Sequence, residues 1–199
     1  MRTTPEETQR NKELIIETAI KVFSEKGFDA TNMQDIADAA GISRGPLYYH
    51  FDCKLTLFNE SVKEYAAKEL QAYRRIFNQD KNILELIRED LYYCSRNIRI
   101  DIETPTLVVP EKEELKEAFQ TIESYRKSVY DIKVASVKNA IEKGELKSDT
   151  DPNHIVNLMF VFYEGLFTMT QKINYITTVE EANKSIESLL TLIKLQYCI

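Results

Sequence analysis

Side chains that can donate hydrogen bonds to phosphate oxygens gather in one stretch of the chain, residues 31–54. Arg44 carries a planar guanidinium that can donate in pairs, and Lys54 carries an ammonium group that acts as a point charge. The imidazole of His50 can donate as well. The hydroxyl donors of this stretch belong to Thr31, Ser43, Tyr48 and Tyr49. These residue types suit the binding of a polyanion, provided that the fold presents them on one surface.

The steric pattern within this stretch predicts two short helices joined by a tight turn. Ala37 is small enough for a close helix crossing, and four residues later Gly41 supplies the positive φ that such a turn requires. Ser43 can cap the second helix, and Pro46 fits its first turn, where an N–H group has no helical partner. The apolar positions that would form the shared core are Ile36, Ile42 and Leu47. Residues 33–51 therefore have the pattern of a helix-turn-helix.

Helix signals recur along the whole chain, and no segment shows the sustained apolar and polar alternation of a half-buried strand. Capping patterns begin at Thr4, Thr31 and Thr178, and we expect Asp52 to cap the long helix that follows the helix-turn-helix. The predicted fold class is therefore all-α, with about nine helices. Their expected bounds are about 5–27, 33–41, 44–50, 54–78, 80–100, 111–119, 121–143, 152–172 and 179–197.

The composition is that of an ordinary globular protein, with 43% hydrophobic and 29% charged residues. The three cysteines are far apart and form no Cys-x-x-Cys pair, which argues against a disulfide framework or a zinc site. No signal peptide is visible, and the most apolar stretch, residues 155–167, is too short to span a bilayer. We therefore expect a cytoplasmic protein without a membrane segment, a metal or a cofactor.

The net charge gives no electrostatic support for nucleic-acid binding. The chain has 26 Lys and Arg against 32 Asp and Glu, a formal net charge of −6. From Phe28 to Lys54, two basic residues stand against four acidic ones, a net charge of −2. Because a nucleic-acid-binding protein usually shows a basic patch, support for DNA binding must come from local geometry.

Residues 31–57 resemble the N-terminal DNA-binding domain of the TetR family of bacterial transcriptional regulators. The matching positions are Ile36-Ala37, Ala40-Gly41-Ile42-Ser43, Gly45, Leu47-Tyr48, His50-Phe51, Lys54 and Leu57. So many matches at fixed spacing are far more specific than a helix-turn-helix pattern alone. Close matching extends over roughly residues 13–57, and the remainder of the chain matches the family only in length and helix count.

The resemblance implies that the second helix of the motif lies in the major groove of DNA and presents its N-terminal residues to base edges. By this analogy Gln34 and Arg44 are base-reading residues, and an arginine there can bind guanine O6 and N7. Gly45 and Pro46 come close to the bases through their backbone. The residues assigned to the phosphate backbone are Thr31, Ser43, Tyr48, Tyr49, His50 and Lys54.

Several of these DNA-binding roles have a structural alternative. Tyr48 and Tyr49 could instead pack against the first helix, and for Tyr49 the two possibilities are evenly balanced. His50 could be a hydrogen-bonded structural histidine, and Arg44 could be a solvated surface charge. The sequence alone leaves these alternatives open.

The resemblance further implies a homodimeric regulator, usually a repressor. Its domain of residues 1–53 would bind a palindromic operator, and its domain of residues 54–199 would bind a small effector. Dimerisation is expected through the last two long helices, packed as a four-helix bundle with the partner's pair. Apolar stripes support this, because a monomer would have difficulty in covering both of them. Their residues are Leu158, Phe162, Leu166, Met169, Ile186, Leu189, Leu190, Ile193 and Tyr197.

The aromatic residues of the second domain predict the class of effector. Tyr and Phe are numerous there and unpaired charges are few, which favours a largely apolar ligand with one or two polar groups. Aromatic residues at helical spacing are more often core than ligand contacts, so both interpretations stay open. The candidate contacts are Tyr92, Tyr93, Arg96, Tyr125, Phe160 and Tyr163.

Two other functional classes remain. The chain could be a helical module that binds a ligand or a protein without binding an operator, and the net charge of −2 around the helix-turn-helix favours this alternative. An enzyme is the least expected class. The chain has only two histidines and no nucleotide-binding, metalloprotease or serine-hydrolase motif, so no catalytic residue is predicted.

Overall fold

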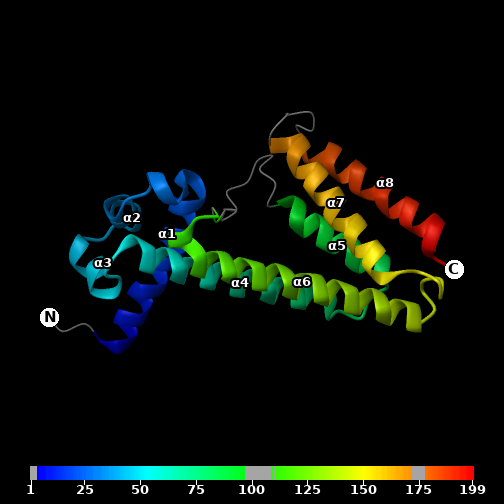
Figure 1. Cartoon of the computed structure of the whole chain (residues 1–199), viewed down its shortest axis with the longest axis horizontal. Helices are drawn as coiled ribbons and strands as arrows, with labels where there is room; N and C mark the ends of the chain where they lie inside the picture. Colours follow the sequence, from blue (N-terminus) through cyan, green and yellow to red (C-terminus); the bar gives the residue numbers. More distant parts are fainter. Residues whose placement is uncertain (1–3, 97–108, 110, 172–177) are drawn as a thin grey trace. The chain divides into compact units, whose positions relative to one another are not determined.

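The computed structural model describes residues 4–96, 109, 111–171 and 178–199. Within these residues the chain forms eight α-helices, one short 3-10 helix and no β-strand (Figure 1). This confirms the all-α fold that the helix signals predict. No helix in the described part of the chain is long and apolar enough to cross a membrane.

The chain divides into two compact units, which we call unit 1 and unit 2. Unit 1 comprises Met1–Glu69 and Pro105–Arg126, and unit 2 comprises Leu70–Thr104 and Lys127–Ile199. Residues 1–53 lie wholly within unit 1. The functional division that we expect after residue 53 stays a prediction.

Unit 1 contains three helices followed by the first part of α4, and a 3-10 turn that leads into the first part of α6. Thr4 caps α1 in a reciprocal capping box with Glu7, with hydrogen bonds of 2.9 and 3.2 Å. In the core, the ring of Phe58 lies 4.8 Å from the rings of both Phe23 and Phe28, measured between centroids. The helix bounds are α1 Pro5–Ala30, α2 Met33–Ala40, α3 Arg44–His50, α4 Lys54–Phe77, η1 Glu113–Leu115 and α6 Lys116–Glu142.

Unit 2 contains the remainder of α4 and α6 together with α5, α7 and α8. Helix α5 packs against both α7 and α8 (Figure 1). Apolar side chains of the three helices form one core. The capping box expected at Thr178 is present, because its hydroxyl accepts the Glu181 N–H at 3.2 Å. The helix bounds are α5 Ile83–Arg96, α7 Pro152–Gln171 and α8 Val179–Tyr197.

The junction between α1 and α2 differs from the sequence-based expectation. Asn32, not Thr31, caps α2, and it exchanges hydrogen bonds of 3.0 and 2.9 Å with Asp35. Thr31 is only 2% exposed, and its hydroxyl donates to the carbonyl of Gly27 at 2.7 Å. The helical conformation of α1 breaks at Gly27, as expected, because its φ of 77° and ψ of 165° are not helical; a short helical piece then follows as far as Ala30.

Helix α6 is one continuous helix where the sequence predicts two. Separate helices are expected over residues 111–119 and 121–143, but only the 3-10 turn at Glu113–Leu115 precedes α6. No glycine or proline lies near residue 120 to end a helix there. The hydroxyl of Thr121 instead donates to the carbonyl of Glu117 at 3.0 Å, a hydrogen bond typical of a threonine inside a helix.

Helix α5 begins three residues later than the expected position, residue 80, because Asn82 caps it. The side chain of Asn82 accepts the N–H of Glu85 at 3.0 Å, and its own N–H donates back to the Glu85 carboxylate at 3.2 Å. Residues 97–100 of the expected helix lie outside the described residues.

The apolar stripes of α7 and α8 are largely covered within unit 2, so the expectation that a monomer leaves them open is wrong. The physical reason is that α5 packs against both helices and supplies the missing apolar partner. Of the stripe residues, Leu166, Ile186, Leu190 and Ile193 are at most 5% exposed. Met169 is the exception among the stripe residues of the described chain, at 39% exposed, and the exposed apolar side chains outside the stripes lie at Val161, Leu192 and Leu195.

Candidate nucleic-acid interface

A glycine in the left-handed conformation positions α3 against α2. Gly41 has a φ of 65° and a ψ of 29°, which residues with a Cβ adopt only at a cost. Its N–H donates to the carbonyl of Asp38 at 3.2 Å, and the N–H of Ile42 donates to that of Ala37 at 3.0 Å. Ala37 and Leu47 are fully buried, so α2 and α3 share a core. The helix-turn-helix predicted from the sequence is present.

One face of α3 is open to solvent. Arg44 and Gly45 are exposed at its start, whereas the side chain of Leu47 is fully buried in the core of unit 1. Tyr48 and Tyr49 follow on the exposed side, with 49% and 77% of their surfaces accessible. Both phenol rings are therefore open to solvent on the same helix as Arg44, and neither belongs to the core of unit 1.

The start of α3 has no side-chain cap among the described residues. Ser43 occupies the residue before the helix, as expected, but its hydroxyl makes no capping hydrogen bond. Pro46 lies half-buried in the first turn, where its missing N–H leaves no helical hydrogen bond unmade. The hydroxyl of Ser43 thus stays at the same edge of unit 1 as Arg44.

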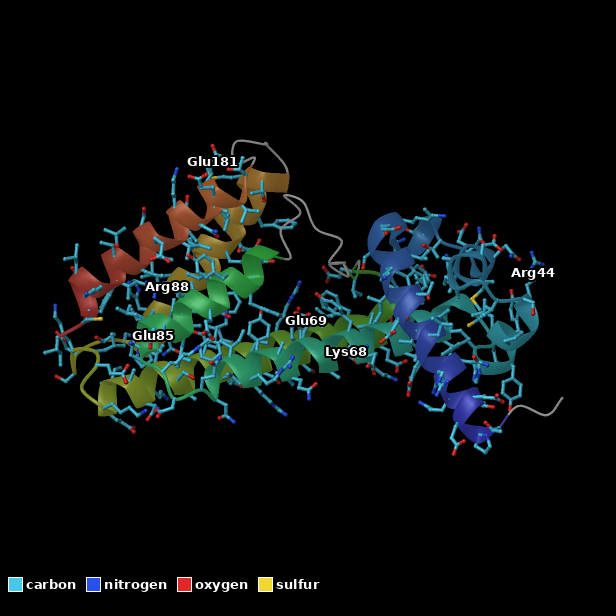
Figure 2. All side chains as sticks on the ribbon, turned by 180° about the vertical axis from the view of Figure 1, so that it is seen from behind. Arg44, Lys68, Glu69, Glu85, Arg88 and Glu181 are labelled. Carbon is cyan, nitrogen blue, oxygen red and sulfur yellow. The ribbon has the colours of Figure 1, made fainter. Side chains whose placement is uncertain are left out.

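Arg44 is oriented by a chain of hydrogen bonds from α2. Its Nε donates to the side-chain oxygen of Gln34, and the amide nitrogen of Gln34 donates to the carboxylate of Asp38. No other hydrogen bond of Arg44 occurs within the described residues, so its two terminal amino groups point into solvent. Figure 2 shows the side chain projecting from the outer side of unit 1. The guanidinium is thus hydrogen-bonded through Nε and exposed to solvent at its two terminal amino groups.

Asp38 joins the hydrogen-bond chain of the candidate site, although sequence reasoning did not assign it there. From the sequence it counts only as one of the acidic residues that oppose DNA binding. In the structure it orients Gln34, which in turn orients Arg44. The available signal was the spacing of four residues between Gln34 and Asp38, which places both side chains on the same face of a helix.

His50 lies at the end of α3, partly buried between aromatic rings. The centroid of its ring is 5.0 Å from that of Tyr49 and 6.3 Å from that of Phe51. Partial burial lowers the pKa of His50, and the nearby charge of Lys12 lowers it further. A lowered pKa favours the neutral imidazole, which has one N–H donor.

Lys54 and Thr31 are directed into unit 1. The ammonium of Lys54 donates to the carbonyl oxygens of Phe28, Asp29 and Thr31, at 2.8, 3.4 and 2.9 Å. It also lies 4.3 Å from the centroid of the Phe28 ring. Because a lysine has three donors, these contacts occupy all of them. A phosphate contact by either residue stays a prediction.

The acidic residues near the helix-turn-helix have partners of their own. Asp29 pairs with Lys112 from the segment before α6, and Asp35 pairs with Lys26 at 3.1 Å. The backbone N–H of Asn32 lowers the pKa of Asp35, and the hydrogen bond from Lys26 lowers it further. The lysines that neutralise these carboxylates lie outside residues 28–54, so the net charge of −2 overstates the local negative charge.

Cys53 is the residue directly before α4, and it follows Asp52, which the sequence predicts as the cap of this helix. Its exposed sulfur lies 3.3 Å from the hydroxyl of Thr56. Hydrogen bonds from the Thr56 side chain and backbone lower the pKa of this thiol, because they stabilise the thiolate.

Three of the candidate effector contacts have different neighbours within unit 2: Tyr92, Tyr93 and Phe160. In unit 2 the hydroxyl of Tyr92 donates to Glu187 at 2.8 Å, and burial together with this carboxylate raises the pKa of Tyr92. The ring of Tyr93 lies 5.5 Å from that of Tyr73. The ring of Phe160 stacks on that of Tyr130 at 6.0 Å.

The other three candidate effector contacts are Tyr163, Tyr125 and Arg96. Tyr163 packs near the Leu166 and Ala182 cluster, 6.5 Å from the ring of Phe167. Tyr125 belongs to unit 1, and the side chain of Arg96 lies outside the described residues. The role of all six candidates as effector contacts stays a prediction.

Comparison with known proteins supports the helix-turn-helix. Residues 15–61 match the model of a family described as bacterial regulatory proteins, tetR family. IcaR of Staphylococcus aureus strain Newman, a negative transcriptional regulator of the icaADBC biofilm operon, is 50% identical over 52 residues. This match covers 26% of the chain and 28% of IcaR, so it spans little more than a quarter of that relative. The transcriptional regulator TtgR of Pseudomonas putida is 27% identical over 173 residues, 83% of the chain and 82% of TtgR.

Solved structures share the fold of the whole chain. A TetR-family transcriptional regulator from Agrobacterium tumefaciens superposes with a TM-score of 0.75 at 16% identity, covering 93% of this chain and 98% of that one. FadR of Bacillus subtilis, solved in complex with stearoyl-CoA, has a TM-score of 0.66 at 18% identity, over 90% of this chain and 97% of that one. At these identities the likeness extends to the fold alone.

Proposed function

Since the N-terminal domain of this chain belongs to the tetR family of bacterial regulatory proteins, we propose that the whole chain is a DNA-binding transcriptional regulator. The observation that carries this proposal is the guanidinium of Arg44, held by Gln34 at the start of α3 and open to solvent at its terminal amino groups. An arginine in this position can donate in pairs to O6 and N7 of a guanine in the major groove.

The other exposed residues of α3 would fix the helix on the phosphate backbone. Tyr48 and Tyr49 carry hydroxyl donors on the surface that presents Arg44, and Ser43 lies beside it. Such contacts set the position and orientation of a protein on DNA but carry no sequence information. The pairing of Asp29 and Asp35 with lysines supports the proposal, because it reduces the repulsion between this surface and DNA.

Repression is the direction of regulation that we propose. IcaR, which is 50% identical to this chain over 52 residues, is a negative regulator. A bound dimer would cover a palindromic operator with its two α3 helices in successive major grooves, about 34 Å apart. Competition with transcription would follow from occupancy of that DNA.

A homodimer through α7 and α8 would present the two α3 helices together. On these helices, Val161, Leu192 and Leu195 are 71%, 64% and 75% exposed, and Gly165 offers no side chain to hold a partner away. Positions 161 and 165 lie one turn apart on α7, and positions 192 and 195 lie one turn apart on α8. A four-helix bundle with a second copy would bury both sets.

The dimer is tested by light scattering. A dimer of two 23.2 kDa chains weighs about 46 kDa and should bury well over ~1,000 Å². The double variant Leu192→Glu, Leu195→Glu should scatter as a monomer and keep the helical circular dichroism spectrum of the parent chain. The control Leu14→Glu, which changes a leucine that is 43% exposed on α1, should stay dimeric. A monomeric parent chain at micromolar concentration would contradict this interface.

A small, largely apolar effector would release the DNA. The effector can act only if it binds one conformation of the dimer more tightly than the other, so that the spacing of the α3 helices changes. FadR of Bacillus subtilis shares the fold and was solved with stearoyl-CoA, which supports a ligand site in the helical part of the chain.

Operator binding is tested by a gel shift with DNA from upstream of the protein's own gene, against random DNA of equal length. The proposal predicts a specific complex with the upstream DNA that withstands an excess of the random competitor. Equal binding to both, or no binding, would instead favour a helical module without an operator.

A further inference from the structure

A buried ion pair connects α5 and α6 inside unit 2. The Nζ of Lys133 lies 2.7 Å from Oδ2 of Asp90, and the two side chains are only 4% and 0% exposed. Both residues belong to unit 2, and no residue of the helix-turn-helix takes part. The DNA-binding function therefore does not account for this pair.

The carboxylate of Asp90 is incompletely hydrogen-bonded. Its second oxygen, Oδ1, is buried and has no hydrogen-bond partner among the described residues. Burial raises the pKa of Asp90, and the charge of Lys133 opposes that rise. Buried carboxylate oxygens normally have partners because an unpaired one is expensive to keep out of water. An orphan acceptor of this kind calls for an explanation.

Aromatic rings surround the ammonium of the same pair. The Nζ of Lys133 lies 4.8 Å from the ring centroid of Phe160 and 5.1 Å from that of Tyr73. The ring of Tyr93 follows at 5.5 Å from that of Tyr73. Four helices contribute to this cluster: α4, α5, α6 and α7. Its acceptor oxygen thus lies in aromatic surroundings.

Stability alone is a weak reason for such a pair. Replacing a buried ion pair by apolar residues of similar size is often neutral or stabilising, because the desolvation of two charges offsets their attraction. A ligand would account for the unpaired oxygen, since a donor group that binds Asp90 Oδ1 completes its hydrogen bonding. The aromatic rings would then cover the apolar part of that ligand.

The charges of the pair restrict the ligand further. Asp90 and Lys133 together are neutral, so an uncharged ligand keeps the buried cluster neutral. An anionic ligand would face the carboxylate of Asp90, and Lys133 is already hydrogen-bonded to that carboxylate. A cationic ligand would leave a net positive charge in the interior, at a high desolvation cost.

We propose that Asp90 is the polar anchor of the effector site, and that the effector is an uncharged aromatic molecule whose O–H or N–H group donates to Asp90 Oδ1. The inference rests on the proposed function, because it assumes that unit 2 binds a regulatory ligand. Lys133 holds the carboxylate in place, and Phe160 and Tyr73 pack against the ligand.

The test compares three probes of similar shape on the full chain by isothermal titration calorimetry without DNA. The probes are 2-naphthol, which has a donor, 2-methoxynaphthalene, which lacks one, and 2-naphthoate, which is anionic. A hydrogen bond to a charged acceptor should make 2-naphthol bind at least about tenfold more tightly than the methoxy compound. Absence of 2-naphthol binding, equal binding of the two, or tightest binding of 2-naphthoate would overturn the proposal.

A double variant locates the site. Asp90→Leu with Lys133→Met removes both charges, so it should fold while the preference for 2-naphthol falls to about one. The matched control removes a half-exposed pair of the same unit, Arg88→Leu with Glu187→Leu, and should keep the preference; Figure 2 labels Arg88. A double variant that keeps the preference would show that the pair is only structural. The probe comparison on the parent chain stands even where the variant folds poorly.

The readouts separate this inference from the proposed function. Calorimetry without DNA reports only on the ligand, whereas the gel shift with upstream DNA reports only on operator binding. A chain that binds DNA but shows no preference for 2-naphthol refutes the anchor alone. A chain that shows the preference but binds no operator refutes the regulator and keeps the site.

Discussion

The two units of this chain differ in where their charged groups lie: among the described residues, the buried charges belong to unit 2. In unit 1 the buried hydroxyls of Thr31 and Ser61 donate to main-chain carbonyls at 2.7 and 2.8 Å, and the key charge, on Arg44, lies at the surface. In unit 2 both charges of the Asp90–Lys133 pair are buried, and one carboxylate oxygen has no partner among the described residues.

The difference corresponds to the size of what each unit would bind. A DNA duplex can be read only by side chains that protrude, and these need a rigid base such as the Ala37 and Leu47 core beneath α3. A small ligand is bound most strongly where it is enclosed and where a few polar groups set its orientation. The charge that we propose for binding therefore lies at the surface in unit 1, on Arg44, and in the interior in unit 2, on Asp90.

The largest expected effect follows from breaking the buried pair on one side. Asp90→Leu or Lys133→Met alone leaves an uncompensated charge in the core, so the free energy of unfolding should fall by about 3–5 kcal/mol. Urea denaturation followed by circular dichroism measures this. The half-exposed Arg88–Glu187 pair is the control, since Arg88→Leu leaves its partner in contact with water and should cost only about 1 kcal/mol. Equal losses of unfolding free energy for the Asp90–Lys133 pair and for the Arg88–Glu187 pair would contradict the contrast between the interior and the surface.

The next effect concerns the surface of unit 1. Arg44→Ala should weaken operator binding by about 1–3 kcal/mol per half-site and flatten the preference for operator over random DNA. Fluorescence anisotropy with labelled DNA measures both affinities. The control is Arg75→Ala, an exposed arginine of α4 outside the helix-turn-helix, which should leave the preference unchanged. If both affinities fall equally, Arg44 contacts only phosphate.

Lys54 sharpens the comparison, because its charge lies in unit 1 but is directed inward. Lys54→Met leaves three carbonyl oxygens without their donor, and the free energy of unfolding should fall by about 1–3 kcal/mol. The exposed Lys21→Met on α1 should have almost no effect. A phosphate contact by Lys54 would appear separately, as a decrease of about 0.9 in the salt slope of DNA binding.

The smallest effect is a pH dependence at the cap of α2. The pKa of Asp35 is lowered in the folded chain, chiefly by the N–H of Asn32, so its contribution to stability is present above the unfolded pKa. That contribution is lost as the pH falls through the folded pKa. Asp35→Ala should therefore be less stable than the parent chain at neutral pH, and the difference should shrink in acid. A difference that does not change with pH, in urea titrations across this range, would refute the role of this carboxylate.

The sequence predicted unit 1 in more detail than unit 2 because the information in unit 1 is local. The positive φ of Gly41, the small side chain of Ala37 and the position of Arg44 all follow from spacing within one short motif. The direction of Lys54 could not be predicted, because its partners lie 23 to 26 residues earlier in the chain.

Unit 2 was predicted as helices but not as a site. Asp90 and Lys133 are 43 residues apart on different helices, and neither stands in a recognisable motif. The apolar stripes of α7 and α8 were recognised correctly, but periodicity does not reveal which partner covers them. Here α5 covers most of their residues within the same unit.

A ligand-responsive regulator requires that its two units influence each other through binding free energy, and one measurement tests this directly. The affinity of the chain for 2-naphthol is measured by calorimetry in the presence and absence of saturating operator DNA, and the operator affinity is measured with and without 2-naphthol. We predict that each ligand weakens the binding of the other by the same factor, between about 5 and 150. Unchanged affinity for 2-naphthol on and off the operator would contradict a ligand-responsive regulator.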